Sequence, residues 1–359
     1  MTASAEYTRP LAELRRSDAA EYGGKSANLG ELLAAGTNVP PGFAVGARAF
    51  RVFVEEAGLD GLVAAETSRA AKGGVDAAAD ASKAIGEAMR FAPLPDAVRT
   101  ELVRRHEALT LEVGEAEPPV AVRSSALGED SSDASHAGQQ ESFLWVRGVE
   151  QICDAVRDCW VSLYTPRAIG YRAALRTEQP DPAMGVTVQR MVDAEVSGVM
   201  FTCNPVSGDP SMVAIEAGFG LGIAVVGGET TPDDYLVSKV TGEVVRRTVS
   251  SKEVEYVPDP AGRGTVRRRV PPERRDAPCL DDDHLAALVE VGRRVERHFG
   301  SHQDVEWAVA RDRTLPESLV VLQARPVTAM PPRDPKLSAS ALSLVMSTFG
   351  ASQGAREEQ

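Results

Sequence analysis

The segment 304–326 constrains this chain most, because two short apolar runs flank a polar turn and still carry charged side chains. The pattern is typical of a hairpin in a core sheet. Asp304 and Glu306 are two residues apart, so both point to one face of their strand. Gln323 and Arg325 do the same on the second run. If the runs pair, two carboxylates, an amide and a guanidinium converge on one patch.

The chemistry of this patch suggests what it could bind. Carboxylate and amide oxygens suit a hard cation such as Mg²⁺, and a guanidinium suits a phosphate oxygen. The patch therefore predicts a floor for a metal ion and a polyphosphate. A strand whose charges pair with one another and face water is the alternative, and this segment alone leaves it open.

Composition limits the class of protein. A chain of 359 residues that is 43% hydrophobic can form two or three domains, or one large enzyme domain. Its net charge of −13 argues against a nucleic-acid partner, but a nucleotide needs only a local basic site. The polar start and the absence of a long apolar run lead us to expect no membrane partner and a cytoplasmic protein. The four cysteines show no spacing typical of a disulfide framework or a zinc site.

A glycine-rich start is the first candidate anion site. Gly23 and Gly24 precede a helix-like run from residue 27 to residue 35, which Gly36 ends. Such a turn frees backbone N–H groups for an anion, and Lys25 adds a positive charge. The spacing of a Walker A loop is absent, and a plain helix start is the alternative.

Arg123 stands at the end of a short apolar run, 119–126, which predicts a buried strand with Arg123 at its edge over a site. The small polar residues that follow, 128–141, are typical of a loop whose N–H groups could close over phosphates. An ordinary surface loop is the alternative.

The segment 183–201 predicts a strand, a polar link and a returning strand, which we expect to open a second lobe. The link at Gln189–Val192 could offer backbone groups to the edge of an adenine. Met191 offers flexible packing for a flat ring, or is simply a core residue.

The remaining patterns predict ordinary elements. We expect helices at 47–57, 75–91, 149–172 and 281–299, and a hairpin at 235–249. The arginine-rich segment 263–275 is expected to be an exposed connection. After residue 330 we expect a proline-rich linker, followed by a helical pattern at 337–348.

Several of these segments together resemble a known family. The chain is similar to the N-terminal nucleotide-binding domain of phosphoenolpyruvate synthase and pyruvate phosphate dikinase, which rifampicin phosphotransferase shares, over roughly residues 9 to 330. The motifs that carry the resemblance, in chain order, are GGKSANLG at 23–30, VPPGF at 39–43, VRSSA at 122–126, AGQQE at 137–141, SGVMFT at 197–202, GLG at 220–222, TPD at 231–233, DVEW at 304–307 and QARP at 323–326.

The resemblance implies an α+β fold of the ATP-grasp type, in which two lobes close on ATP and Mg²⁺, with Mn²⁺ as the alternative ion. We expect an N-terminal lobe with the phosphate loop at 1–180 and a C-terminal lobe with the metal and phosphate floor at 181–330. Residues 331–359 are expected to form a linker, a possible helix and a disordered tail.

The resemblance also implies roles for individual residues. Lys25, Arg123 and Arg325 would hold phosphates and serve catalysis. Glu306 and Gln323 would ligate Mg²⁺, with Asp304 in support. Gln189, Met191 and Val192 would belong to the adenine hinge, and Gly138 and Gln139 to the loop over the phosphates.

Two positions depart from the family pattern. His136 stands where the family's phosphate loop usually has an aromatic residue, and Ile223 stands where its glycine motif continues with Glu. A histidine could add a pH-sensitive contact or be tolerated at a loop tip. At position 223 the side chain is apolar, so the acidic group of the family pattern is missing there.

The five histidines show no setting like that of the family's phosphorylatable histidine. Our first hypothesis is therefore an ATP-binding subunit of a split dikinase, as in phenylphosphate synthase. It would pass the β-phosphoryl group of ATP to a histidine on a separate subunit, which would bind the small-molecule acceptor, with AMP and phosphate as by-products. A direct small-molecule kinase that releases ADP and a non-catalytic nucleotide-binding regulator are the alternatives.

Overall fold

The computed structural model describes residues 6–127, 141–175, 182–262 and 264–327. The first sheet has five strands in the order β1–β2–β5–β3–β4, and all neighbours are antiparallel. Its strands are β1 (Thr8–Pro10), β2 (Gly42–Val45), β3 (Val120–Ala126), β4 (Ser142–Val146) and β5 (Met184–Arg190).

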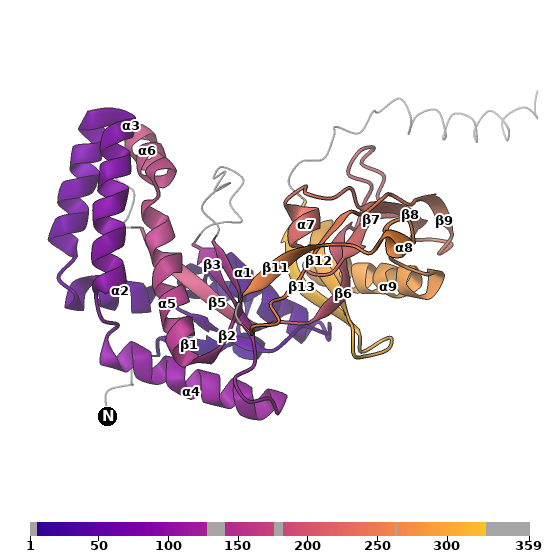
Figure 1. Cartoon of the computed structure of the whole chain (residues 1–359), viewed down its shortest axis with the longest axis horizontal. Coiled ribbons are helices and arrows are strands. Elements are labelled where there is room, and N and C mark those ends of the chain that lie inside the picture. Colours follow the sequence, from indigo (N-terminus) through magenta and orange to yellow (C-terminus); the bar gives the residue numbers. More distant parts are fainter. Residues whose placement is uncertain (1–5, 128–140, 176–181, 263, 328–359) are drawn as a thin grey trace, which may run out of the picture.

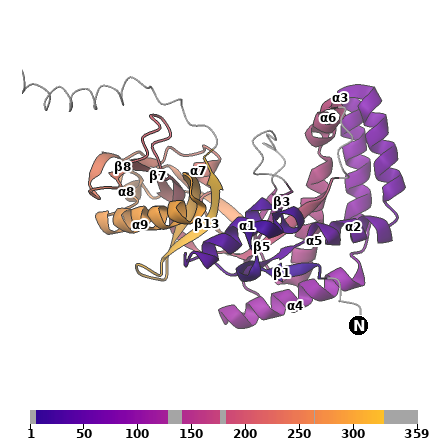
Figure 2. The same cartoon turned by 180° about the vertical axis from the view of Figure 1, so that it is seen from behind.

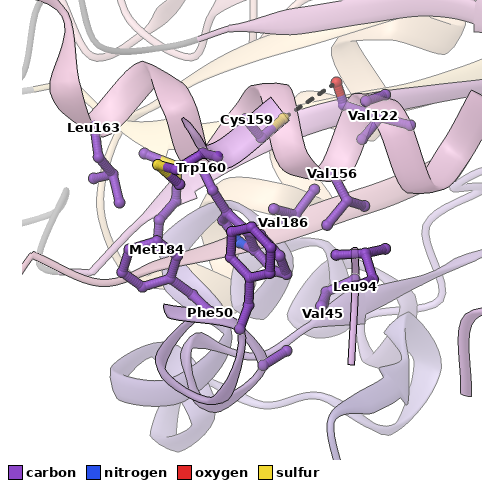
Figure 3. Close-up of a cluster of buried hydrophobic side chains, with 14 of the residues drawn as sticks. Val45, Phe50, Leu94, Val122, Val156, Cys159, Trp160, Leu163, Met184 and Val186 are labelled. Atoms are coloured by element: carbon purple, nitrogen blue, oxygen red, sulfur yellow. Dashed lines mark hydrogen bonds between the residues drawn. The ribbon is translucent and has the colours of Figure 1, made fainter. Parts of the chain in front are cut away.

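Helices surround this sheet and bury its apolar residues. Figure 1 shows α3 and α6 standing together at the end of the molecule farthest from the second sheet. Trp160 on α5 is fully buried and packs against Phe50 of α2 (Figure 3). It also stacks on Phe53 of the same helix. The helices are α1 (Ala19–Ala34), α2 (Ala47–Glu56), α3 (Asp60–Phe91), α4 (Asp96–Val113), α5 (Gly148–Val161) and α6 (Pro166–Leu175), with short 3₁₀ turns at Leu11–Glu13, Arg16–Asp18 and Ser162–Tyr164.

The second sheet has six antiparallel strands in the order β13–β12–β6–β7–β8–β9. One face packs against the long helix α9 (Asp282–Phe299), whose apolar side carries Leu285, Leu288 and Val295. The strands are β6 (Ala194–Phe201), β7 (Met212–Phe219), β8 (Asp233–Ser238), β9 (Val244–Thr248), β12 (Gln303–Ala310) and β13 (Leu319–Pro326). A separate ribbon of β10 (Val254–Pro258) and β11 (Thr265–Arg269) lies beside them with the short helices α7 (Ile223–Val226) and α8 (Pro272–Arg275).

Helix α1 joins the two sheets. It packs against β3 and β5 of the first sheet and against β13 of the second, and Figure 2 shows it between them from behind. Gly23 interrupts its helical geometry with φ +79°. A side chain at Gly23 would stand 2.2 Å from the Ser125 Oγ, so this glycine permits the close approach of α1 to β3.

The structure confirms a mixture of helices and sheets. The expected ATP-grasp geometry with two closing lobes, and its division at residues 180 and 330, stay predictions. The two strands expected within 183–201 are present but enter different sheets: β5 pairs with β2 and β3 of the first sheet, whereas β6 pairs with β12 and β7 of the second. The link between them therefore connects two sheets instead of turning a hairpin, because alternation within a strand does not specify its neighbour.

Two expectations from the sequence concern the C-terminal third of the chain. The segment 263–275 is not only a connection, since β11 and α8 lie within it. The helical pattern at 337–348 and the tail after it fall outside the described residues. Within the part of the chain that the structure describes, no helix is both long and apolar enough to cross a membrane.

Candidate nucleotide and metal site

The two runs at 304–326 pair as β12 and β13, which confirms the expected hairpin. Asp304 lies opposite Arg325, and Glu306 lies opposite Gln323. Residues that are directly opposite in an antiparallel pair share a face, so the four polar side chains lie on one patch. Arg325 donates from Nε to the Asp304 Oδ2 at 2.8 Å, and this Arg325 side chain is 58% exposed.

A side chain from the first sheet completes the patch. Arg123 on β3 donates from Nη2 to the Glu306 Oε2 at 3.0 Å. Both side chains are largely buried, with exposed fractions of 17% and 25%. Arg123 at the edge of β3 therefore lies across from the expected metal and phosphate floor, and its contact with Glu306 links the two sheets.

Lys25 lies beside this junction. Its Nζ donates to the Ser124 carbonyl oxygen at 3.1 Å, next to Arg123 in the chain, and the residue is buried. One turn further along α1, Asn28 donates to the Ala324 carbonyl at 3.3 Å. Helix α1 thus fixes Lys25 near both β3 and β13, and a role in binding an anion stays a prediction.

A cavity of about 200 Å³ opens between the two sheets. Arg123 and Glu306 lie at its polar side, and Gln189 contributes from β5. Its other walls are mostly apolar, which suits a flat ring better than a second charged group. The apolar wall includes Leu144, Met191, Val192, Leu221, Ile223 and Leu322.

The link at Gln189–Val192 lines this cavity, but part of its hydrogen-bonding capacity is already used. The Arg190 amide donates to the Pro41 carbonyl at 2.9 Å, and the Met191 amide donates to the Pro119 carbonyl at 2.8 Å. The buried Gln189 side chain donates to the Pro40 carbonyl at 3.3 Å. These bonds hold the link in one conformation, and a role in binding adenine stays a prediction.

The glycine motif 220–222 forms another part of the wall. The Leu221 amide donates to the Tyr256 carbonyl at 2.8 Å, and Ser197 Oγ donates to the Gly220 carbonyl at 2.6 Å. Ile223 follows at the start of α7 and lines the cavity with an apolar side chain. The position where the family pattern has Glu is therefore part of the apolar wall here.

Not every expected residue lines the cavity itself. Lys25, Asp304, Gln323 and Arg325 lie outside its lining. Gln323 and Asp304 are nevertheless tied to it, because Gln323 lies opposite Glu306 and Asp304 is two residues from Glu306 on the same face. Gly138, Gln139 and His136 fall outside the described residues.

The oxygen atoms on the floor fit a hard cation. The Gln323 Oε1 is buried and has no hydrogen-bond partner in the described part of the chain. Burial raises the pKa of the Asp304 carboxyl, Arg325 opposes this increase, and the Glu306 carboxylate adds to it. A divalent cation would satisfy the amide oxygen and offset the repulsion between the carboxylates.

No group of three or more His, Cys, Asp or Glu residues is arranged to hold a metal ion within the described ranges. This finding still suits Mg²⁺, which proteins commonly bind through one or two carboxylates while phosphate oxygens and water complete the shell. The floor therefore fits a metal that arrives together with a polyphosphate.

Leu322 was missed by the sequence reasoning. Strict alternation places it on the face opposite to Gln323. A β-bulge makes Glu306 and Trp307 pair with Gln323 and Val321, so Leu322 is the extra residue. It consequently lines the cavity, and no signal in the sequence marks the bulge.

Comparison with known proteins gives consistent matches. The sequence model described as "Pyruvate phosphate dikinase, AMP/ATP-binding domain" matches residues 19–343. A protein named "Probable phosphoenolpyruvate synthase" from Methanothermobacter thermautotrophicus is 38% identical over 97% of this chain and 50% of its own length. One with the same name from Methanocaldococcus jannaschii is 39% identical over 91% of this chain and 27% of its own.

A third relative, named "Phosphoenolpyruvate synthase", comes from Aeropyrum pernix and is 37% identical over 85% of this chain and 40% of its own length. The chain thus spans half or less of the length of these three curated relatives.

Proposed function

Since the chain belongs to the family of the pyruvate phosphate dikinase AMP/ATP-binding domain, we propose that it is the ATP-binding subunit of a dikinase-type phosphotransferase. It transfers the β-phosphoryl group of ATP to a histidine on a separate subunit, and the final products from ATP are AMP and phosphate. Water supplies the oxygen that the released phosphate gains. The final acceptor is a small molecule bound by that partner, as the name phosphoenolpyruvate synthase of the relatives suggests. A cytoplasmic location belongs to the same proposal.

The contact between Arg123 and Glu306 is the observation that carries this proposal. It brings a phosphate-binding type of side chain from one sheet against a metal-binding type from the other, at the polar side of an apolar cavity. Phosphoryl transfer requires mainly positioning and charge neutralisation, and this arrangement provides groups for both.

Each group has a role in the proposal. Lys25, Arg123 and Arg325 neutralise phosphate oxygens. Glu306 and Gln323 would hold Mg²⁺, or Mn²⁺, with Asp304 beside them, and the ion would supply positive charge to offset that of the phosphates. The apolar wall with Met191 and Val192 holds the base. Closure of two ATP-grasp lobes around the nucleotide keeps bulk water from the β-phosphoryl group while that group is transferred.

The histidines of the described residues support a separate acceptor. His284 contacts Asp281, His298 contacts Glu31, and His302 contacts Glu296. None of them, nor His106, lines the cavity, and His136 lies outside the described residues. The four described histidines therefore offer no acceptor at the cavity, and our proposal places the acceptor histidine on a partner subunit.

Transfer of label tests the proposal. The purified chain is incubated with Mg²⁺ and ATP labelled at the β-phosphate, with and without the isolated histidine domain of a dikinase. Label on the histidine domain together with AMP supports the proposal. ADP formed by the chain alone would favour a direct kinase, and ATP that is bound but intact in both samples would favour a regulator.

A matched pair of variants makes this test specific. Glu306→Gln keeps the shape of the side chain but removes its charge. We expect it to reduce the rate of label transfer by about 10²–10³-fold, which is the usual effect on an enzyme of losing one group that stabilises charge in the transition state. Glu273→Gln, an exposed position on α8, should transfer label at the wild-type rate. Equal rates for the two variants would remove Glu306 from the site.

A further inference from the structure

A second cavity, of about 310 Å³, shares a wall with the first. Arg190, Met191 and Val192 line both cavities. The other walls of the second cavity come from the loop before β2, the end of β4 and the turn after β12. Both sheets therefore contribute to it, and the link between the sheets separates it from the candidate nucleotide site.

Arginines dominate the charge of this second cavity. Arg147, Arg190, Arg311 and Arg313 line it, with three carboxylates from Glu115, Asp193 and Asp312. The chain as a whole carries a net charge of −13, so a lining with more cations than anions is a local reversal of charge. Such a reversal inside a cavity favours an anionic ligand.

The arginines are only loosely paired with these carboxylates. Arg147 and Arg190 share Glu115 at 3.5 and 3.6 Å, and Arg311 lies 3.7 Å from Asp193. These distances are longer than those of charge-assisted hydrogen bonds.

Several arginine donors point to other acceptors or have none. Arg147 donates to the Glu117 carbonyl at 2.8 Å, and Arg311 donates to the Ala194 carbonyl at 3.3 Å. The Arg190 Nε is buried and has no hydrogen-bond partner among the described residues. Because a guanidinium has five N–H donors, the lining keeps donors for a further acceptor.

The wall of this cavity also contains Trp145, which is buried and has a φ of +59°. A bulky residue rarely adopts this left-handed conformation, and it persists where the surrounding structure fixes it. Its carbonyl accepts a hydrogen bond from the Gly264 amide at 3.4 Å, at the tip of the β10–β11 ribbon. The cavity is thus bounded on this side by a fixed aromatic residue.

We propose that the second cavity binds the phosphate group of a small metabolite, and that its occupancy changes the nucleotide affinity of the first cavity. The arginines come from three directions, after β4, at the end of β5 and after β12, which suits the tetrahedral oxygens of a phosphate better than a planar carboxylate. The coupling follows from the shared wall at 190–192. The phosphate site stands independently of the proposed function, whereas the coupling rests on it.

Calorimetric titration of inorganic phosphate into the full chain tests the site. The first cavity is kept saturated with a non-hydrolysable ATP analogue and Mg²⁺, and the ionic strength is matched throughout. Wild type is expected to bind one phosphate. Arg147→Ala and Arg313→Ala should each weaken binding by about tenfold, the loss expected for one charge-assisted contact.

Arg99→Ala is the matched control, because Arg99 is an exposed arginine on α4 that pairs with Glu150 and lies outside both cavities. It should leave phosphate binding unchanged. Two variants at different walls keep the test valid if one of them unfolds, which circular dichroism would reveal. Equal phosphate affinity in all three variants would overturn the site. Phosphate binding that is seen without the ATP analogue and disappears when the analogue saturates the first cavity would overturn it as well.

Two further titrations identify the ligand. Glycerol 3-phosphate that binds as tightly as inorganic phosphate, or more tightly, supports a phosphate ester, and preference for inorganic phosphate supports the free ion. Malonate that binds equally well would overturn the assignment to a phosphate group.

The coupling is measured as the change in the dissociation constant of the analogue with and without phosphate. We expect at least about a fivefold change, the lower end for coupled sites, and no change would refute the coupling. A chain that binds phosphate through Arg147 but never binds the analogue would contradict the proposed function and leave the second site intact.

Discussion

Gly23→Ala is the substitution whose effect follows most directly from the structure. The backbone at Gly23 has φ +79° and ψ 162°, a region that only glycine adopts readily, so any other residue costs of the order of 1–3 kcal/mol. The added Cβ would stand 2.2 Å from Ser125 Oγ and 2.3 Å from the Ser125 carbonyl oxygen. Because the carbonyl belongs to β3, α1 must move, and overpacking of this kind costs about 1–3 kcal/mol more.

Gly36→Ala separates the two contributions. Gly36 also has a positive φ, +70°, but a Cβ there would meet no atom within 4 Å. Only backbone strain of about 1–2 kcal/mol is expected. Urea unfolding should therefore show a larger loss of unfolding free energy for Gly23→Ala than for Gly36→Ala.

The same pair of variants tests the link to function. Movement of α1 away from β3 would break the hydrogen bond from Lys25 to the Ser124 carbonyl. ATP affinity is therefore expected to fall in Gly23→Ala and to remain at the wild-type value in Gly36→Ala. Losses of stability that agree within about 0.5 kcal/mol, with equal ATP affinities, would refute the reasoning.

Two further predictions concern stability. Burial acts to raise the pKa of the Glu31 carboxyl, but hydrogen bonds from the Arg16 amide and the His298 ring outweigh it, so the pKa is lowered in the folded protein. The ionised Glu31 carboxylate therefore stabilises the fold above the unfolded-state pKa, and this stabilisation is lost as pH falls through the folded-state pKa. Glu31→Gln should thus lower the unfolding free energy by about 1–2 kcal/mol at neutral pH and leave it unchanged in strong acid. Urea unfolding of both proteins at the two pH values measures this difference. An equal loss of unfolding free energy at both pH values would contradict the prediction. Lys252 and Asp233 form a fully buried ion pair, so Lys252→Met should cost about 3–5 kcal/mol because it leaves a buried carboxylate without its cation. Asp233→Asn combined with Lys252→Met should recover part of that loss in the same assay, and a double variant no more stable than the single one would contradict the explanation.

The sequence alone determined the polar floor. The two-residue spacing of Asp304 and Glu306, and of Gln323 and Arg325, places each pair on one face of a strand whatever the rest of the chain does. Only residues 311–318 connect the two runs, so their pairing is local and the hairpin needs no distant contact to be predicted. The helices at 47–57 and 281–299 were predictable for the same reason, since helical periodicity is a property of neighbouring residues.

Tertiary structure decided what the sequence left open. Residues 184–190 and 194–201 are adjacent in the chain, yet they enter different sheets, because pairing depends on partners such as β2 and β12 that lie far away in sequence. The bulge that turns Leu322 toward the cavity depends on how β13 fits against β12. Neither choice is encoded in a local pattern.

The contact between Arg123 and Glu306 also belongs to the tertiary structure, because 183 residues separate them in sequence. The same holds for the second cavity, because Arg147 and Arg190 come from the ends of β4 and β5 in the first sheet and Arg313 follows β12 of the second. The sequence determined which chemical groups each strand carries, by local periodicity. Which of those groups face one another was decided by the packing of α1 between the sheets, since long-range contacts form only once the chain is folded.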